Sequence, residues 1–176
     1  GVGLNVLQGA ALVNASPIVA VDVQDHKLAQ ARAFGATHVL RADHPQVESE
    51  LRALSGGRGF DVAVEATGLA PVRDLVYRLA GNTGMAILAG VPHHEDRMTI
   101  DSFHLHFGKR LLGVHGGHTK PDVDIPRYLQ LYRLGKLKLS EQITHRVPLQ
   151  QINEALEYVR QGAAGRCLLQ MSPDGR

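Results

Sequence analysis

Short apolar runs rich in valine, isoleucine and alanine alternate with segments of helical periodicity through residues 1–116. Strands that alternate with helices in this way are typical of a parallel sheet whose two faces are covered by helices. The sequence therefore predicts an α/β fold with a doubly wound parallel sheet of the Rossmann kind. Five strands are expected in this region, and their sequences are PIVAVDV, THVL, FDVAVEAT, GMAILAGV and RLLGVHG.

Local signals set the expected ends of the helices between these strands. A helix over residues 2–13 should stop at Asn14 in a left-handed conformation, before a strand that is apolar enough to be covered on both faces. Asp43 is the expected N-cap of another helix, with Gln46 as its reciprocal partner. Pro71 suits the first turn of the helix that follows FDVAVEAT, and Gly81 suits its end.

The pattern changes after about residue 116. We expect a helix over residues 125–134 capped by Asp124, a second helix that ends just before Gly162, and a final strand RCLLQM. The chain therefore divides into a dinucleotide-binding region, residues 1–116, and a C-terminal segment, residues 117–176.

The strand count points to a particular gap. A dinucleotide fold of this kind has six strands in the order 3-2-1-4-5-6, and the strand that lacks a counterpart here is the first, which lies at the centre. If it precedes Gly1, then Gly1, Val2 and Gly3 form the last part of a glycine-rich turn that brings a pyrophosphate to a helix N-terminus. The alternative is an ordinary pair of loop glycines. Without that strand we expect these residues to be unstable or to aggregate.

Asp22 lies 19 residues beyond Gly3, at the end of the second expected strand. A carboxylate at this place accepts hydrogen bonds from an adenosine ribose diol and repels a 2′-phosphate, so NAD is favoured over NADP. The alternative is that Asp22 only caps the helix that follows.

Several segments together resemble the zinc-containing alcohol dehydrogenases of the medium-chain dehydrogenase/reductase superfamily. The segments are GVGLNVLQGA, VAVDVQDHKLAQARAFGAT, FDVAVEATG, LAGVP and ITHRVPLQQINEALEYVRQGAAGRCLL, in the order and spacing of that family. The resemblance implies the coenzyme-binding part of an enzyme that transfers a hydride between an alcohol or aldehyde and NAD. It also implies a catalytic domain before Gly1, without which these residues would be inert.

The same resemblance implies roles for single residues. Asp22 and Lys27 would bind the adenosine ribose, and Arg166 would return to the pyrophosphate. Lys27 could instead be a solvated helix lysine, and Arg166 a surface arginine. The remaining residues implied to line the coenzyme site, on the adenosine and nicotinamide sides, are Thr67, Gly68, Ala89, Gly90 and Val91.

No metal site or catalytic residue is expected in this chain. The only cysteine, Cys167, matches neither the catalytic nor the structural zinc site that the resemblance places in the absent domain. His104 and His106 point apart if helical, and His93 and His94 are neighbours that do not easily share a tetrahedral site. Asp61 and Glu65 are four residues apart on one expected strand, too far for an acid–base pair.

Composition excludes other classes of protein. The net charge of +2 is spread along the chain, which gives no support for a nucleic-acid partner. No apolar run approaches the roughly 20 residues that span a bilayer, so we expect a soluble, cytoplasmic protein with no membrane partner. The resemblance adds a homo-oligomer as the expected assembly.

Three alternatives remain open. A zinc-independent quinone or enoyl reductase of the same superfamily would usually prefer NADPH, which Asp22 disfavours. A methyltransferase would leave LAGVP and the last helix unexplained. A non-catalytic nucleotide-binding module would account for a dinucleotide fold with no catalytic residues.

Overall fold

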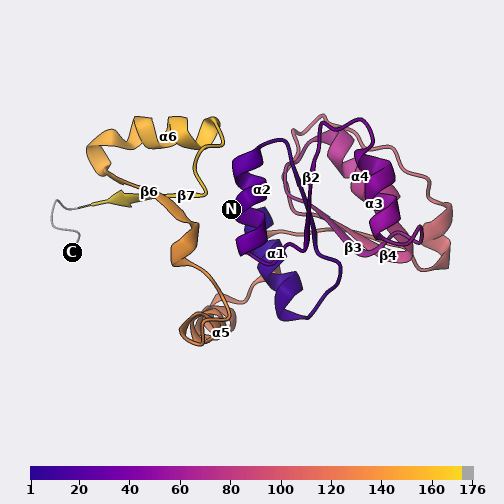
Figure 1. Ribbon diagram of the computed structural model, residues 1–176, viewed down its shortest axis with the longest axis horizontal. Helices are drawn as coiled ribbons and strands as arrows, with labels where there is room; N and C mark the ends of the chain where they lie inside the picture. The colour runs from indigo at the N-terminus through magenta and orange to yellow at the C-terminus, as the bar shows by residue number, and fades with distance from the viewer. Residues whose placement is uncertain (172–176) are drawn as a thin grey trace. The chain divides into compact units, whose positions relative to one another are not determined.

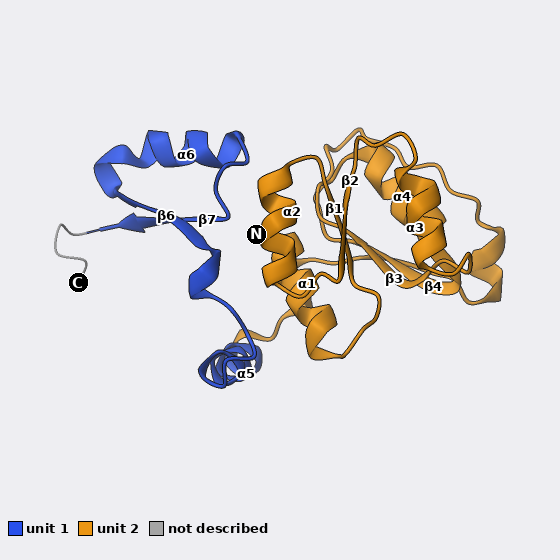
Figure 2. Ribbon diagram, viewed as in Figure 1, with its two compact units in different colours: residues 1, 122–176 blue, residues 2–121 orange. Residues whose placement is uncertain are grey.

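The computed structural model describes residues 1–171 of the 176-residue chain. The chain forms two compact units, one of residues Val2–Pro121 and one of Gly1 with the residues from Asp122 onward, which Figure 2 distinguishes. No helix among residues 1–171 is long and apolar enough to cross a membrane.

The first unit contains five strands in two parallel sheets. β1 (Val19–Asp22) pairs with β2 (His38–Arg41). The other sheet has the order β3-β4-β5, with β3 (Phe60–Glu65), β4 (Ala80–Leu88) and β5 (Arg110–Gly113). Figure 1 labels β2, β3 and β4 of these strands. The predicted α/β class with parallel strands is therefore confirmed. Within residues 1–171, β1 and β3 do not pair, and the break falls where the strand count places the central strand.

Four α-helices belong to this unit. They are α1 (Val2–Leu12), α2 (Asp25–Ala33), α3 (Val47–Leu54) and α4 (Ala70–Leu79), and short 3₁₀ turns η1 (Phe103–Phe107) and η2 (Gly116–His118) follow later in the unit. α1 precedes β1, and the other three α-helices connect successive strands from β1 to β4. One buried cluster contains Leu7 of α1, Ile18 just before β1 and Phe34 just after α2. A second cluster, built on Tyr77 and Ala86, lies between α4 and the β3-β4-β5 sheet.

Some local predictions hold. Asn14 ends the first helix with φ 57°, in the left-handed region, and Pro71 lies in the first turn of α4. The predicted stop at Gly81 is wrong, because α4 ends at Leu79 and the chain enters β4 directly at Ala80.

The predicted Asp43 cap is also wrong. Gln46 is the residue that precedes α3, and no side chain caps this helix. The Asp43 carboxylate binds the Arg41 guanidinium instead, because a forked, charged donor two residues away competes with the helix amides.

β1 is less covered than predicted. Val21 on β1 is 39% exposed, whereas the sequence predicted that this strand is buried on both faces. Val62 on β3 is 53% exposed as well. Each of these strands has a hydrogen-bonded neighbour along only one edge in the described part of the chain, so fewer side chains cover it.

The second unit holds one small parallel sheet, of β6 (Ile143–Pro148) and β7 (Arg166–Gln170). α6 (Ile152–Arg160) connects these strands, after the turns η3 (Ser140–Gln142) and η4 (Leu149–Gln151). α5 (Pro121–Arg133) begins at the boundary of the two units. Asp124 lies inside α5 and pairs with Arg127 at 3.6 Å, so its predicted role as a cap is wrong.

Candidate functional site

Asp22 is the last residue of β1, and the chain turns there into α2. Its Oδ1 accepts a hydrogen bond from the Gln24 amide at 3.0 Å, which fixes the turn before the helix begins at Asp25. That amide is the one hydrogen-bond donor to the Asp22 carboxylate among the described residues, so Oδ2 can accept from an incoming hydroxyl. Lys27, in the first turn of α2, is half-buried on the same connection.

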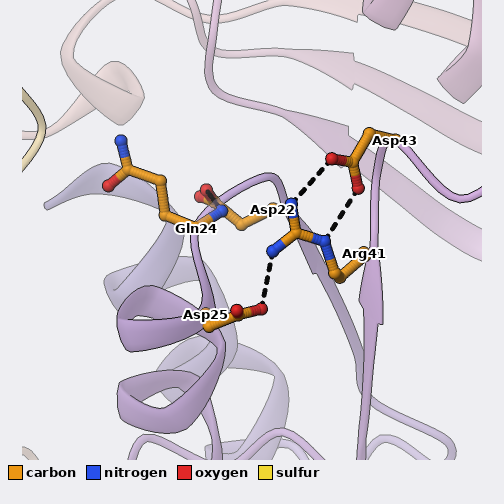
Figure 3. A network of polar contacts seen from close by, with 5 residues as sticks. All are labelled: Asp22, Gln24, Asp25, Arg41 and Asp43. Carbon is orange, nitrogen blue, oxygen red and sulfur yellow. Dashed lines mark hydrogen bonds and ion pairs between the residues drawn. The ribbon is translucent and has the colours of Figure 1, made fainter.

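Arg41 ends β2 beside Asp22, and three of its hydrogen bonds form the network in Figure 3. Its Nε and Nη2 donate to the two oxygens of Asp43 at 2.8 and 2.6 Å, and Nη1 donates to Asp25 at 2.7 Å. The hydrogen bonds to Arg41 hold the pKa of Asp43 below its usual range, and the two carboxylates raise the pKa of the guanidinium. Arg41 and Asp43 therefore remain charged at neutral pH.

Glu65 ends β3 and is the most deeply buried large side chain among residues 1–171, at 1% exposed. Its Oε2 accepts from the amides of Thr67 and Gly68 at 2.9 and 2.8 Å and from the Thr67 hydroxyl at 3.3 Å. Its Oε1 accepts from the Gly90 amide at 3.1 Å. One carboxylate thus joins the loop after β3 to the loop after β4.

Two glycines let these loops approach each other. Gly68 has φ +77°, and a Cβ there would overlap the Val91 carbonyl oxygen. A Cβ on Gly90 would overlap the Gly68 amide nitrogen and lie 2.7 Å from the Thr67 amide nitrogen. Glycine is needed at both positions because backbone atoms occupy the space of a side chain.

At the start of the chain, where the sequence predicts a glycine-rich turn, there is free space beside Gly3. α1 begins at Val2, and a Cβ added to Gly3 would meet no atom within 4 Å. Gly1 belongs to the second unit together with Arg166, and a Cβ on Gly1 would lie 3.5 Å from Arg166 Cζ. The Arg166 side chain, at the start of β7, is exposed.

The structure therefore brings the predicted residues together in three groups: Asp22 with Lys27; Thr67 and Gly68 with Ala89, Gly90 and Val91; and Gly1 with Arg166. The carboxyl ends of parallel strands, where the first two groups lie, are where open α/β sheets bind ligands.

Sequence reasoning did not single out Arg41, and it considered Glu65 only as one member of an acid–base pair. An acidic residue that ends an apolar strand three residues before a glycine is a signal that would have found Glu65. Asp43 lies only two residues from Arg41, but the second partner, Asp25, lies 16 residues away, so local sequence does not indicate that both carboxylates bind this guanidinium.

No group of three or more histidine, cysteine, aspartate or glutamate side chains in the described part of the chain is placed to hold a metal ion. Asp61, at the start of β3, is exposed, whereas Glu65 at its end is buried and fully engaged with amides. The residues described therefore supply no set of ligands that fits a zinc ion.

Comparisons with known proteins agree on one family. The sequence profile of the zinc-binding dehydrogenases matches residues 1–133. Alcohol dehydrogenase 2 of Zea mays is 35% identical over 97% of this chain, which spans 45% of the length of that relative.

Solved structures agree with this. Benzyl alcohol dehydrogenase from Acinetobacter calcoaceticus superposes with a TM-score of 0.90 at 27% identity, over 97% of this chain and 47% of that one. A zinc-binding dehydrogenase structure from Sinorhizobium meliloti, described as bound to NADP, has a TM-score of 0.75 at 25% identity, over 88% of this chain and 45% of that one. The chain belongs to the zinc-binding dehydrogenase family, and it corresponds to the coenzyme-binding fold and C-terminal segment of alcohol dehydrogenases.

Proposed function

We propose that this chain binds NAD and presents it for hydride transfer between an alcohol and its aldehyde. The observation that carries the proposal is Asp22, whose Oδ1 is held by the Gln24 amide while Oδ2 can accept from a ribose hydroxyl. A carboxylate fixed in this way at the end of the second strand of a dinucleotide fold recognises the ribose diol. One of the similar structures carries NADP, so the fold alone does not choose between the two coenzymes.

Lys27 would bind the same ribose from the first turn of α2. The pyrophosphate would lie at the start of α1, near the main chain of Val2 and Gly3. The family resemblance alone adds Gly1 and Arg166 to this role, and a guanidinium is suited to binding phosphate. These assignments use the ordinary chemistry of helix amides and guanidinium groups toward phosphate.

The nicotinamide end would lie at the joined loops after β3 and β4. Thr67 and Gly68 on one loop, and the segment 89–91 on the other, present main-chain groups whose positions Glu65 sets through its hydrogen bonds. When bound, the nicotinamide accepts or donates the hydride; the residues of this chain orient it and stay chemically unchanged.

The proposal extends to the whole enzyme. Its substrates would be small alcohols or aldehydes, and its zinc would be held by residues outside this chain. We expect these 176 residues on their own not to oxidise an alcohol. The same proposal includes a cytoplasmic location and a homo-oligomer. Among residues 1–171, β5 has a paired strand along only one edge, so a second copy of the chain can extend its sheet.

Isothermal titration with NAD tests the proposal on the protein that carries this chain, after circular dichroism has shown that it is folded. We expect the Asp22→Asn variant to bind NAD about tenfold or more weakly, because the lost interactions are hydrogen bonds to a charged group.

Asp61→Asn is the matched control, since it makes the same chemical change on an exposed residue of β3 and should leave the Kd for NAD unaltered. A folded protein that shows no heat of binding for NAD, or an Asp22→Asn variant that binds as tightly as the wild type, would contradict the assignment.

A further inference from the structure

An arginine stands beside the carboxylate proposed to hold the coenzyme ribose. Arg41 is the register partner of Asp22 across β1 and β2, and neighbouring strands lie about 4.8 Å apart. The Ala42 amide donates to the Asp22 carbonyl oxygen at 3.0 Å, so the pairing continues one residue past the end of β2. A ribose bound by Asp22 would therefore lie near the long, flexible side chain of Arg41.

An arginine in this neighbourhood would ordinarily favour NADP, because a guanidinium binds a 2′-phosphate with paired hydrogen bonds. The structure leads to the opposite expectation, because carboxylates of this chain already bind the N–H donors of the guanidinium. Asp43 takes Nε and Nη2 as a bidentate pair, and Asp25, the first residue of α2, takes Nη1. Figure 3 shows the guanidinium directed to these two carboxylates while the Asp22 side chain turns to the Gln24 amide.

The charges point the same way. Two carboxylates around one guanidinium leave the cluster with one net negative charge. Asp22 adds a second, and the Lys27 ammonium proposed for the same ribose offsets one of them. The hydrogen bonds between Arg41 and Asp43 keep the Asp43 pKa low, so this balance persists across the neutral range. A 2′-phosphate would meet repulsion where the arginine alone would have attracted it.

We infer that Asp25 and Asp43 make Arg41 a selectivity residue: by occupying its guanidinium, they prevent it from binding a 2′-phosphate, and the site accepts NAD and rejects NADP. The inference rests on the proposed function, since it requires the adenosine ribose to lie at Asp22.

The network contributes little to folding, which makes the inference testable. The Arg41, Asp25 and Asp43 side chains are 42%, 80% and 55% exposed. Ion pairs this open to water add little stability, so their removal should leave the protein folded.

The experiment measures the Kd for NAD and for NADP, at the same low ionic strength, in the wild type and two variants. In Asp25→Asn/Asp43→Asn the released guanidinium should tighten NADP binding by about tenfold or more, with the Kd for NAD unchanged. In Asp25→Asn/Asp43→Asn/Arg41→Ala the gain should disappear. The gain should also shrink as salt is added, because these charges are exposed.

Glu48→Gln is the matched control. Glu48 on α3 pairs with Arg52 at 2.9 Å and with Arg78 at 3.0 Å. This similar surface cluster does not include Arg41, so the loss of the Glu48 charge should leave both Kd values unaltered. If Asp25→Asn/Asp43→Asn disturbs the fold, Asp25→Asn alone still releases Nη1 and should give a smaller gain.

The outcomes separate the two proposals. Wild-type protein that binds no NAD would overturn the proposed function and this inference with it. Wild-type protein that binds NAD, with no gain for NADP in the double variant, would overturn the inference alone. A gain that survives Arg41→Ala would overturn it too, because it would come from the lost negative charge rather than from the arginine.

Discussion

Replacing Glu65 by glutamine tests whether one buried carboxylate joins the loops that follow β3 and β4. The side chain is 1% exposed and accepts four hydrogen bonds, from the Thr67 amide and hydroxyl and from the Gly68 and Gly90 amides. Glutamine has the same shape but offers one acceptor oxygen and one NH₂ donor. In either orientation the NH₂ group must face an amide that now donates to the carboxylate.

The better orientation places the amide nitrogen at the Oε1 position, opposite Gly90. The Gly90 amide then keeps only its longer bond, 3.3 Å, to the Glu65 main-chain oxygen, whereas the other orientation disrupts the bonds to Thr67 and Gly68. A buried donor left without its partner costs about 1–3 kcal/mol, so we expect the free energy of unfolding to fall by about 2 kcal/mol. NAD binding should weaken as well, because the same loops form the proposed nicotinamide pocket.

Urea denaturation followed by circular dichroism measures the first effect, and NAD titration the second. Asp61→Asn is the control, since Asp61 lies on the same strand with an exposed side chain. Its free energy of unfolding should change by no more than about 0.5 kcal/mol. If Glu65→Gln unfolds at the same urea concentration as Asp61→Asn, the carboxylate does not hold the loops and the reasoning is refuted.

Two further substitutions test packing and charge in the same unit. Gly90→Ala should lower the free energy of unfolding by about 1–3 kcal/mol or more, because its Cβ would overlap the Gly68 amide. Gly9→Ala is the control: Gly9 lies inside α1, a new Cβ there meets no atom within 4 Å, and stability should rise by up to about 1 kcal/mol. Equal melting temperatures for the two variants would contradict the close approach of the loops. Glu48→Gln should lower stability by at most about 1 kcal/mol at neutral pH. Hydrogen bonds from two arginines lower the Glu48 pKa, so its contribution is present above the unfolded value of 4.5 and is lost as the pH falls through the folded pKa. A wild-type advantage over Glu48→Gln that persists in strong acid would show that the ion pairs are not its source.

Predictions that depended on neighbouring residues fared unevenly, and the failures share a cause. The left-handed Asn14 and the Pro71 helix start were predicted correctly because backbone sterics act within a few residues. The Asp43 cap was wrong because that carboxylate has a stronger, charged partner in Arg41. Propensity rules rank what a residue can do locally and do not include competition from other side chains.

The sequence by itself determined the class of the fold, the order of its helices and parallel strands, and the acidic residue at the end of β1. Periodicity, helix-end signals and spacing carry that information, because each depends on short stretches of chain. Only the tertiary structure decided what surrounds the strand ends. Parallel pairing places Arg41 beside Asp22, the first residue of α2 then reaches its guanidinium, and a buried Glu65 draws together two loops about 25 residues apart in sequence. A hydrogen bond forms only when donor and acceptor lie about 3 Å apart. Which distant segments come that close depends on how the chain packs, and the sequence separation of two residues does not indicate it.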